Sequence, residues 1–110
     1  MIRQAFVMQV HPGAEAEYVR RHQPIWPELE KTLLDHGVST YSIFLLPRTH
    51  QLFAYVEFRS EQEWNSIAQT QVCQRWWTSM MELMPCDAQH RPVATPLEEV
   101  FHIEASGSTL

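Results

Sequence analysis

The sequence of 110 residues has few cysteines, no long hydrophobic run and no block of like charge. Its two cysteines, Cys73 and Cys86, are too few for a disulfide scaffold and lack the spacing of metal ligands. No apolar stretch is long enough to cross a bilayer, and no charged-then-apolar signal segment begins the chain. These absences predict a reduced, cytoplasmic protein with no membrane partner.

A basic surface is also missing. The formal net charge is −5, and the arginines are scattered along the chain instead of clustered. Nucleic-acid binding needs a positive patch that faces the phosphates, so no nucleic-acid partner is expected.

Aromatic residues, by contrast, are abundant. Four Trp, five Phe and three Tyr occur in a chain in which 45% of residues are hydrophobic and 19% are charged. This composition is typical of one compact domain, and aromatic side chains also line small-molecule pockets and interfaces. We therefore expect a single domain over residues 1–104, followed by a loose tail at residues 105–110.

The hydrophobic periodicity predicts alternating strands and helices. A period of two indicates strands, and apolar residues three or four apart indicate helices. Ser60 and Glu63 fit a capping box at the start of a helix. The expected strands are residues 2–10, 38–46, 51–59 and 96–104, and the expected helical segments are residues 14–22, 27–37, a short one from 61, and 70–85.

This order predicts an α+β fold of the ferredoxin-like, split βαβ type, with an antiparallel sheet and helices on one face. The second sheet face also receives apolar or aromatic residues, which we expect to include Tyr41, Phe53 and Tyr55. A second copy of the sheet could cover that face and give a homodimer of the dimeric α+β barrel kind. Otherwise the same residues line a pocket between the sheet and a partner.

One histidine stands out by its surroundings. Tyr18 and His22 are four residues apart, so on a helix they project from the same face. Pro24 then interrupts the helix. The positive charges of Arg20 and Arg21 are expected to lower the pKa of the imidazole. Taken alone, His22 is better explained as a helix-terminal histidine that bonds the last carbonyls.

The other histidines give no comparable signal. No two of the six have the spacing of a metal-binding pair, so no metal is expected. Four of them adjoin predicted loops or helix ends and are interpreted as solvated: His11, His36, His50 and His90. His102 lies on the last predicted strand and is ambiguous.

A tandem tryptophan is the second candidate. On a helix, Trp76 and Trp77 point about 100° apart, so both cannot occupy the centre of one core stripe. One interpretation places Trp76 in the core and Trp77 in a dimer interface. The other makes the pair a pocket wall, since indole faces suit the C–H surface of a sugar ring. With the hydroxyls of Tyr18 and Tyr41, such a pocket suggests proton transfer on a neutral polar ligand.

These stretches closely resemble the L-rhamnose mutarotase family, and the likeness runs from residue 1 to about 103. The matching residues are Met1-Ile2-Arg3, Tyr18, Arg20-Arg21-His22, Pro24-Ile25-Trp26-Pro27-Glu28-Leu29 and Val72-Cys73-Gln74-Arg75-Trp76-Trp77.

The resemblance implies a dimeric cytoplasmic enzyme that interconverts the α and β anomers of L-rhamnopyranose without a cofactor. It implies that His22 is the general acid and that Tyr18, Tyr41, Trp76 and Trp77 bind the monosaccharide. Our hypothesis is that the imidazolium of His22 protonates ring oxygen O5, while water or another pocket group takes the O1 proton. The alternatives are a small cofactor-free monooxygenase of the same fold type and a non-catalytic sugar-binding module.

Overall fold

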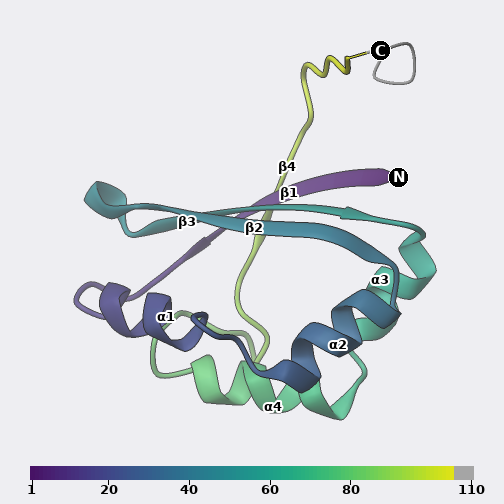
Figure 1. Cartoon of the computed structure of the whole chain (residues 1–110). Coiled ribbons are helices and arrows are strands. Elements are labelled where there is room, and N and C mark those ends of the chain that lie inside the picture. Colours follow the sequence, from purple (N-terminus) through teal and green to yellow (C-terminus); the bar gives the residue numbers. More distant parts are fainter. Residues whose placement is uncertain (106–110) are drawn as a thin grey trace.

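The computed structural model describes residues 1–105 and consists of one sheet with a layer of helices on one side of it (Figure 1). The four strands run in the order β2-β3-β1-β4, and every neighbouring pair is antiparallel. This is the ferredoxin-like arrangement predicted from the sequence. The elements are β1 (Ile2–Gln9), α1 (Glu15–Arg21), α2 (Pro27–Asp35), β2 (Val38–Leu46), a 3-10 turn (Pro47–Thr49), β3 (Gln51–Phe58), α3 (Glu61–Ile67), α4 (Gln71–Met80) and β4 (Thr95–Leu97).

Local capping fixes where the helices begin. The Ser60 hydroxyl accepts a hydrogen bond from the backbone N–H of Glu63 at 3.2 Å, which confirms the predicted cap of α3. Thr70 caps α4 in the same way through the N–H of Cys73. α4 ends at Met80 and not at residue 85, because the Leu83 N–H bonds the carbonyl of Met80, three residues back, and tightens the chain into a turn.

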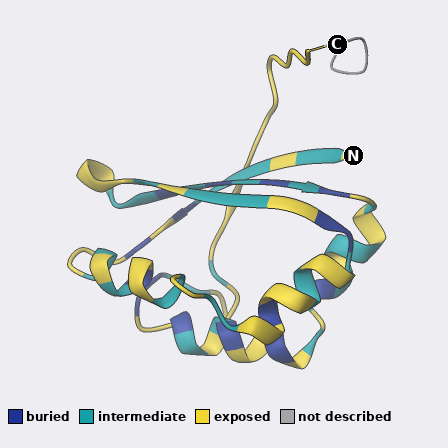
Figure 2. Ribbon diagram, in the orientation of Figure 1, coloured by how far each residue is buried: buried dark blue, intermediate teal, exposed yellow. Residues whose placement is uncertain are grey.

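The core lies between the sheet and the helices (Figure 2). β3 is the central contributor, because every second residue of it is almost completely buried; these residues are Leu52, Ala54, Val56 and Phe58. The indole of Trp64 on α3 stacks on the Phe58 ring with 5.0 Å between ring centroids. The predicted helical stripe is buried opposite the sheet and comprises Val72, Trp76, Met80 and Met84.

The prediction that Tyr41 lies on the second face of the sheet is wrong. Its ring packs against the helix-side core, 6.0 Å from the Trp64 ring and 6.5 Å from the Phe6 ring. The reason is strand register, since Tyr41 pairs with Val56, and directly paired residues project to the same face. The outer face carries Phe53 and Tyr55, as predicted, because they alternate with the buried residues of β3.

The last strand is much shorter than predicted. Residues 96–104 were expected to be extended and paired, but β4 covers only Thr95–Leu97, opposite Ala5–Val7 of β1. Residues 98–105 leave the sheet as an arm that projects away from the helices (Figure 1). An ion pair between Arg3 and Glu99 at 2.9 Å ties the start of this arm to β1. The apolar residues of this stretch therefore do not form a strand, because no neighbouring segment of residues 1–105 pairs with their backbone.

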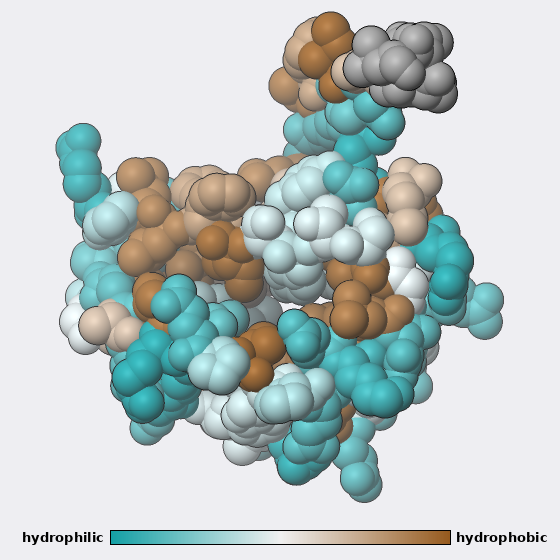
Figure 3. Space-filling view, in the orientation of Figure 1, coloured by the Kyte–Doolittle hydropathy of each residue, from teal (hydrophilic) through white to brown (hydrophobic). Residues whose placement is uncertain are grey.

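The arm exposes apolar side chains. Val100 is 88% exposed, Phe101 77% and Ile103 79%, and they form the isolated brown patch above the body in Figure 3. Residues 106–110 of the predicted tail lie outside the described residues. No helix within residues 1–105 combines the length and apolar character that a bilayer crossing requires.

Candidate active site

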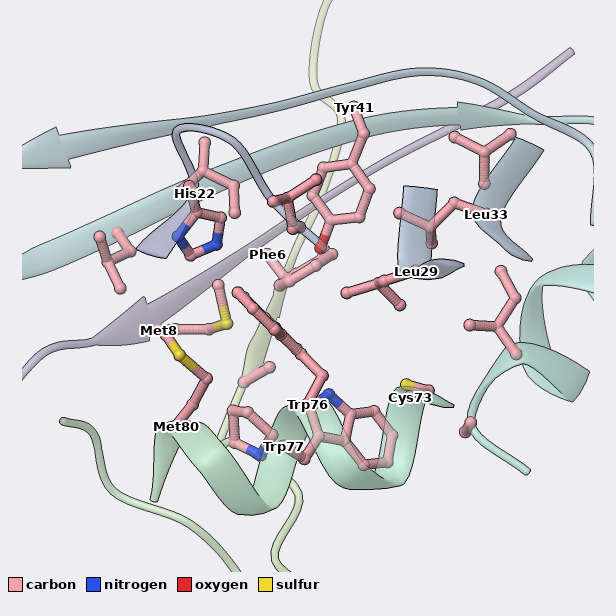
Figure 4. A pocket seen from close by; sticks show the side chains of 18 of the residues that line it. Phe6, Met8, His22, Leu29, Leu33, Tyr41, Cys73, Trp76, Trp77 and Met80 are labelled. Carbon is pink, nitrogen blue, oxygen red and sulfur yellow. The ribbon is translucent and has the colours of Figure 1, made fainter. Parts of the chain in front are cut away.

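A cavity of about 910 Å³ lies between the sheet and the helix layer, and all five predicted site residues line it. Tyr18 and His22 come from α1 and its C-terminal cap, Tyr41 comes from β2, and Trp76 and Trp77 come from α4. Figure 4 shows His22, Tyr41 and the indoles around one space. Residues far apart in the sequence thus meet where the first and second halves of the chain pack together.

The backbone of α1 fixes the orientation of His22. Its Nδ1 lies 2.8 Å from the carbonyl oxygen of Tyr18, one turn earlier. Because a carbonyl can only accept, Nδ1 carries the hydrogen, and the lone pair of the neutral ring is on Nε2. Nε2 has no hydrogen-bond partner among residues 1–105. The imidazole packs 4.4 Å from the Tyr18 ring and meets the Trp76 indole edge-on at 5.2 Å.

Burial lowers the pKa of His22 below the usual value of 6.5, and the hydrogen bond to the Tyr18 carbonyl opposes this shift in part. The direction agrees with the prediction, but the predicted cause was wrong. The guanidinium of Arg20 pairs with Glu17, and that of Arg21 pairs with Glu17 and Glu82. Their charges are therefore balanced locally, and desolvation of the imidazolium dominates.

The two phenols supply uncommitted hydroxyl groups. Neither the Tyr18 nor the Tyr41 hydroxyl has a hydrogen-bond partner among residues 1–105, yet neither is a buried unsatisfied atom. Each hydroxyl therefore keeps some accessible surface, and both residues line the cavity. Burial raises the pKa of Tyr18 and of Tyr41 well above the usual 10, so both stay protonated and can donate or accept.

The two tryptophans differ in burial. Trp76 is 8% exposed and packs edge-on against the Trp26 indole at 5.1 Å, so it belongs to the core and to the cavity wall at once. Trp77 is half-buried, and the guanidinium carbon of Arg91 lies 5.1 Å from its ring centroid. Trp76 therefore lies in the core, as the first interpretation expected, and both indoles line the cavity, as the second expected.

Cys73 also lines the cavity, and burial raises the pKa of its thiol to about 11. Thiolates and not thiols are the nucleophiles, so this residue is held in its unreactive form at neutral pH. No three His, Cys, Asp or Glu side chains of residues 1–105 come together as a metal-binding group.

Sequence reasoning missed two charged residues of the lining. Glu30 on α2 is the carboxylate that borders the cavity within residues 1–105, and Arg91 comes from the connection between α4 and β4. Glu30 follows the apolar Leu29 on a helix, where a charged side chain is usually solvated and gives no sign of a site. Arg91 lies in a polar segment without periodicity, so no local pattern signalled its position.

The comparisons with known proteins agree with the resemblance. Residues 3–103 match the family model described as L-rhamnose mutarotase. The L-rhamnose mutarotase of Cronobacter sakazakii is 56% identical over 104 residues, which cover 94% of this chain and all of the relative.

Solved structures show the same likeness. The L-rhamnose mutarotase of Formosa agariphila aligns with a TM-score of 0.86 at 38% identity, over 94% of this chain and all of that chain. A putative antibiotic biosynthesis monooxygenase from Nitrosomonas europaea has a TM-score of 0.63 at 8% identity, covering 90% of this chain and 89% of that one, and shares the fold alone. From the match over nearly its whole length, the chain belongs to the L-rhamnose mutarotase family.

Proposed function

We propose that this protein is an L-rhamnose mutarotase, an isomerase that interconverts the α and β anomers of L-rhamnopyranose. The observation that carries the proposal is an aromatic cavity in which one imidazole nitrogen and two phenol hydroxyls have no protein partner within residues 1–105. Such groups are what a neutral sugar requires for binding and proton transfer. Family membership supports the choice of sugar.

Mutarotation needs a modest catalyst. The proton on O1 must leave while O5 gains one, the C1–O5 bond breaks, and O1 becomes a carbonyl oxygen. Rotation about C1–C2 and closure in reverse then give the other anomer. The reaction proceeds unaided in water, and one placed acid–base group supplies about 10²–10⁴-fold, or roughly 3–5 kcal/mol.

His22 is our candidate for that group. Burial favours its neutral form, so Nε2 first accepts the O1 proton, and the resulting imidazolium donates a proton to O5. O1 and O5 are both bonded to C1, which allows one nitrogen to serve both atoms. This order keeps the imidazolium of His22 as the donor to O5 but replaces the water or other pocket group of the sequence-based hypothesis, because His22 itself accepts the O1 proton.

The other four residues would bind the sugar. In this proposal, the hydroxyls of Tyr18 and Tyr41 hold ring hydroxyl groups, and the indoles of Trp76 and Trp77 face the C–H surface and the methyl group. None of these four side chains gains or loses a proton during the reaction. They position the anomeric carbon at Nε2 of His22.

Anomer exchange measured by saturation-difference NMR tests the function. Adding the protein to L-rhamnose should speed the transfer of saturation between the anomeric protons well above the spontaneous rate. Binding of L-rhamnose without faster exchange would instead indicate a sugar-binding module. Oxygen uptake with a quinol or another aromatic substrate would indicate the monooxygenase alternative.

The pH profile tests the protonation state of His22. Because burial lowers its pKa, the imidazole is neutral at pH 7 and becomes charged only as the pH falls through a value below 6.5. We expect kcat/KM, corrected for the spontaneous reaction, to be level near pH 7 and to decrease on the acidic side with a midpoint below 6.5. A loss of rate on raising the pH through that midpoint would contradict the neutral form as the active one.

We also propose that the protein is a homodimer in which a second copy covers the outer sheet face. Phe44 is 65% exposed on that face, and register places it beside Phe53, which in turn lies beside Val7. A row of apolar side chains across three strands is unusual for a lone chain and suits a two-fold partner with the same row.

Sedimentation tests this assembly. The wild-type protein is expected to sediment with the mass of two chains at micromolar concentration, and Phe44→Glu should shift it toward one, because a charge would be buried in the interface. Met81→Glu is the matched control, since Met81 is also exposed but follows α4 in the helix layer. A wild type that sediments as one chain would contradict the proposal.

A cytoplasmic location completes the proposal. Cys73 and Cys86 are both free thiols, as is usual in a reducing compartment.

A further inference from the structure

A short loop between α4 and β4 presents Arg91 to the cavity. The Asp87 carboxylate accepts from the backbone N–H groups of Gln89 at 2.9 Å and Arg91 at 3.0 Å, and the Asp87 N–H donates to the Arg91 carbonyl at 2.8 Å. The loop is closed by a bond from the Val93 N–H to the Pro85 carbonyl. Only backbone atoms of Arg91 take part, so its side chain is not needed to brace the loop.

The guanidinium of Arg91 lies at the rim of the cavity. Its central carbon is 5.1 Å from the ring centroid of Trp77, and the residue is part of the cavity lining. Its positive charge also acts to lower the pKa of Cys73, against the larger rise that burial causes. Arg91 and Cys73 both line this cavity, so the charge of Arg91 lies close enough to act on a group of the lining.

This charge has no acidic partner within the described chain. Arg48 and Arg91 form no ion pair among residues 1–105, whereas the other arginines do; those are Arg3, Arg20, Arg21, Arg59 and Arg75. Arg48 lies in the 3-10 turn between β2 and β3 and does not line the cavity. Within residues 1–105, Arg91 is therefore the arginine that lines the cavity without an ion pair.

We propose that Arg91 is a further substrate-binding residue of this site, which donates hydrogen bonds to hydroxyl groups of the bound sugar. The inference rests on the proposed function and adds a rim contact to it. The contact with the Trp77 ring is a cation–π contact that uses none of the guanidinium N–H groups as hydrogen-bond donors, so these donors remain available to ligand oxygens. The same charge gives the site affinity for a pyranose that carries a carboxylate.

The kinetic test compares two arginines. Arg91→Met should raise KM for L-rhamnose about tenfold, because that factor corresponds to the binding free energy of one hydrogen bond to a charged group. It should lower kcat much less. Arg48→Met removes an arginine that also has no ion pair among residues 1–105 but does not line the cavity, and it should leave both constants unchanged. A KM within twofold of wild type in Arg91→Met, or the same rise in Arg48→Met, would overturn the inference.

A charged probe provides a readout that a merely structural role of Arg91 would not change. Galacturonate should compete with L-rhamnose in the wild type and in Arg91→Lys, and this competition should be lost in Arg91→Met. Equal competition in Arg91→Met would overturn the inference. A wild type that binds L-rhamnose without accelerating exchange would refute the proposed function, while the binding constants of the two methionine variants would still decide the role of Arg91.

Discussion

His22→Ala should remove most of the acceleration of anomer exchange, lowering kcat/KM by about 10²–10⁴-fold. The loss follows from the protonation states around the cavity. The phenols of Tyr18 and Tyr41 and the thiol of Cys73 all have raised pKa values and hold their protons at neutral pH. The pKa of His22 is lowered and its Nε2 has no hydrogen-bond partner in the described part of the chain, so His22 is the group suited to accept and return a proton.

A second histidine provides a matched control for this variant. His36 follows α2 as His22 follows α1, and its Nδ1 lies 2.7 Å from the carbonyl of Thr32, one turn earlier. It does not line the cavity. His36→Ala therefore removes the same local contact and should leave the exchange rate unchanged, whereas equal losses in both variants would show that the effect is structural.

Glu30 offers the second check on His22. It is the carboxylate in the described cavity lining, and Glu30→Gln keeps its size while removing its basicity. If His22 serves both O1 and O5, Glu30→Gln should retain the wild-type pH profile. If His22→Ala keeps its activity while Glu30→Gln loses it, the carboxylate is the proton acceptor and our assignment is wrong.

The fold could be predicted where each residue's environment is decided locally. The alternation of Leu52, Ala54, Val56 and Phe58 and the Ser60 cap depend on neighbours a few residues away, and both were confirmed. The last strand could not be predicted, because pairing of residues 98–104 depends on backbone groups of another segment. Periodicity describes which faces are apolar and says nothing about whether a partner strand is present.

The candidate site shows the same division. The four-residue spacing of Tyr18 and His22 predicted their contact, which the structure confirms at 4.4 Å between the rings. The cause of the His22 pKa shift was missed because it is burial, and burial depends on contacts between distant segments, such as that of His22 with the Trp76 indole. Arg91 was missed for the same reason, since its position is set by the loop that Asp87 braces.

Trp76→Ala should destabilise the protein by about 3–5 kcal/mol, the usual cost of removing a large buried aromatic side chain. Trp76 is 8% exposed and fills the space between the Trp26 and His22 rings. Trp77→Ala should cost only about 1–2 kcal/mol, because this indole is half-buried and lies at the cavity rim under Arg91. Urea unfolding at one fixed protein concentration measures both values and avoids differences caused by association.

Substitutions at these two neighbouring positions should therefore affect stability and sugar binding to different extents. Trp77→Ala is expected to weaken L-rhamnose binding about tenfold while the protein stays well folded, because the lost indole is cavity wall and not core. Trp76→Phe keeps much of the packing against Trp26 and removes the indole N–H, so it should fold and still bind the sugar less tightly. If Trp77→Ala unfolds as readily as Trp76→Ala and binds L-rhamnose as tightly as wild type, Trp77 is a structural residue. The paired tryptophans would then not form a common wall around the sugar.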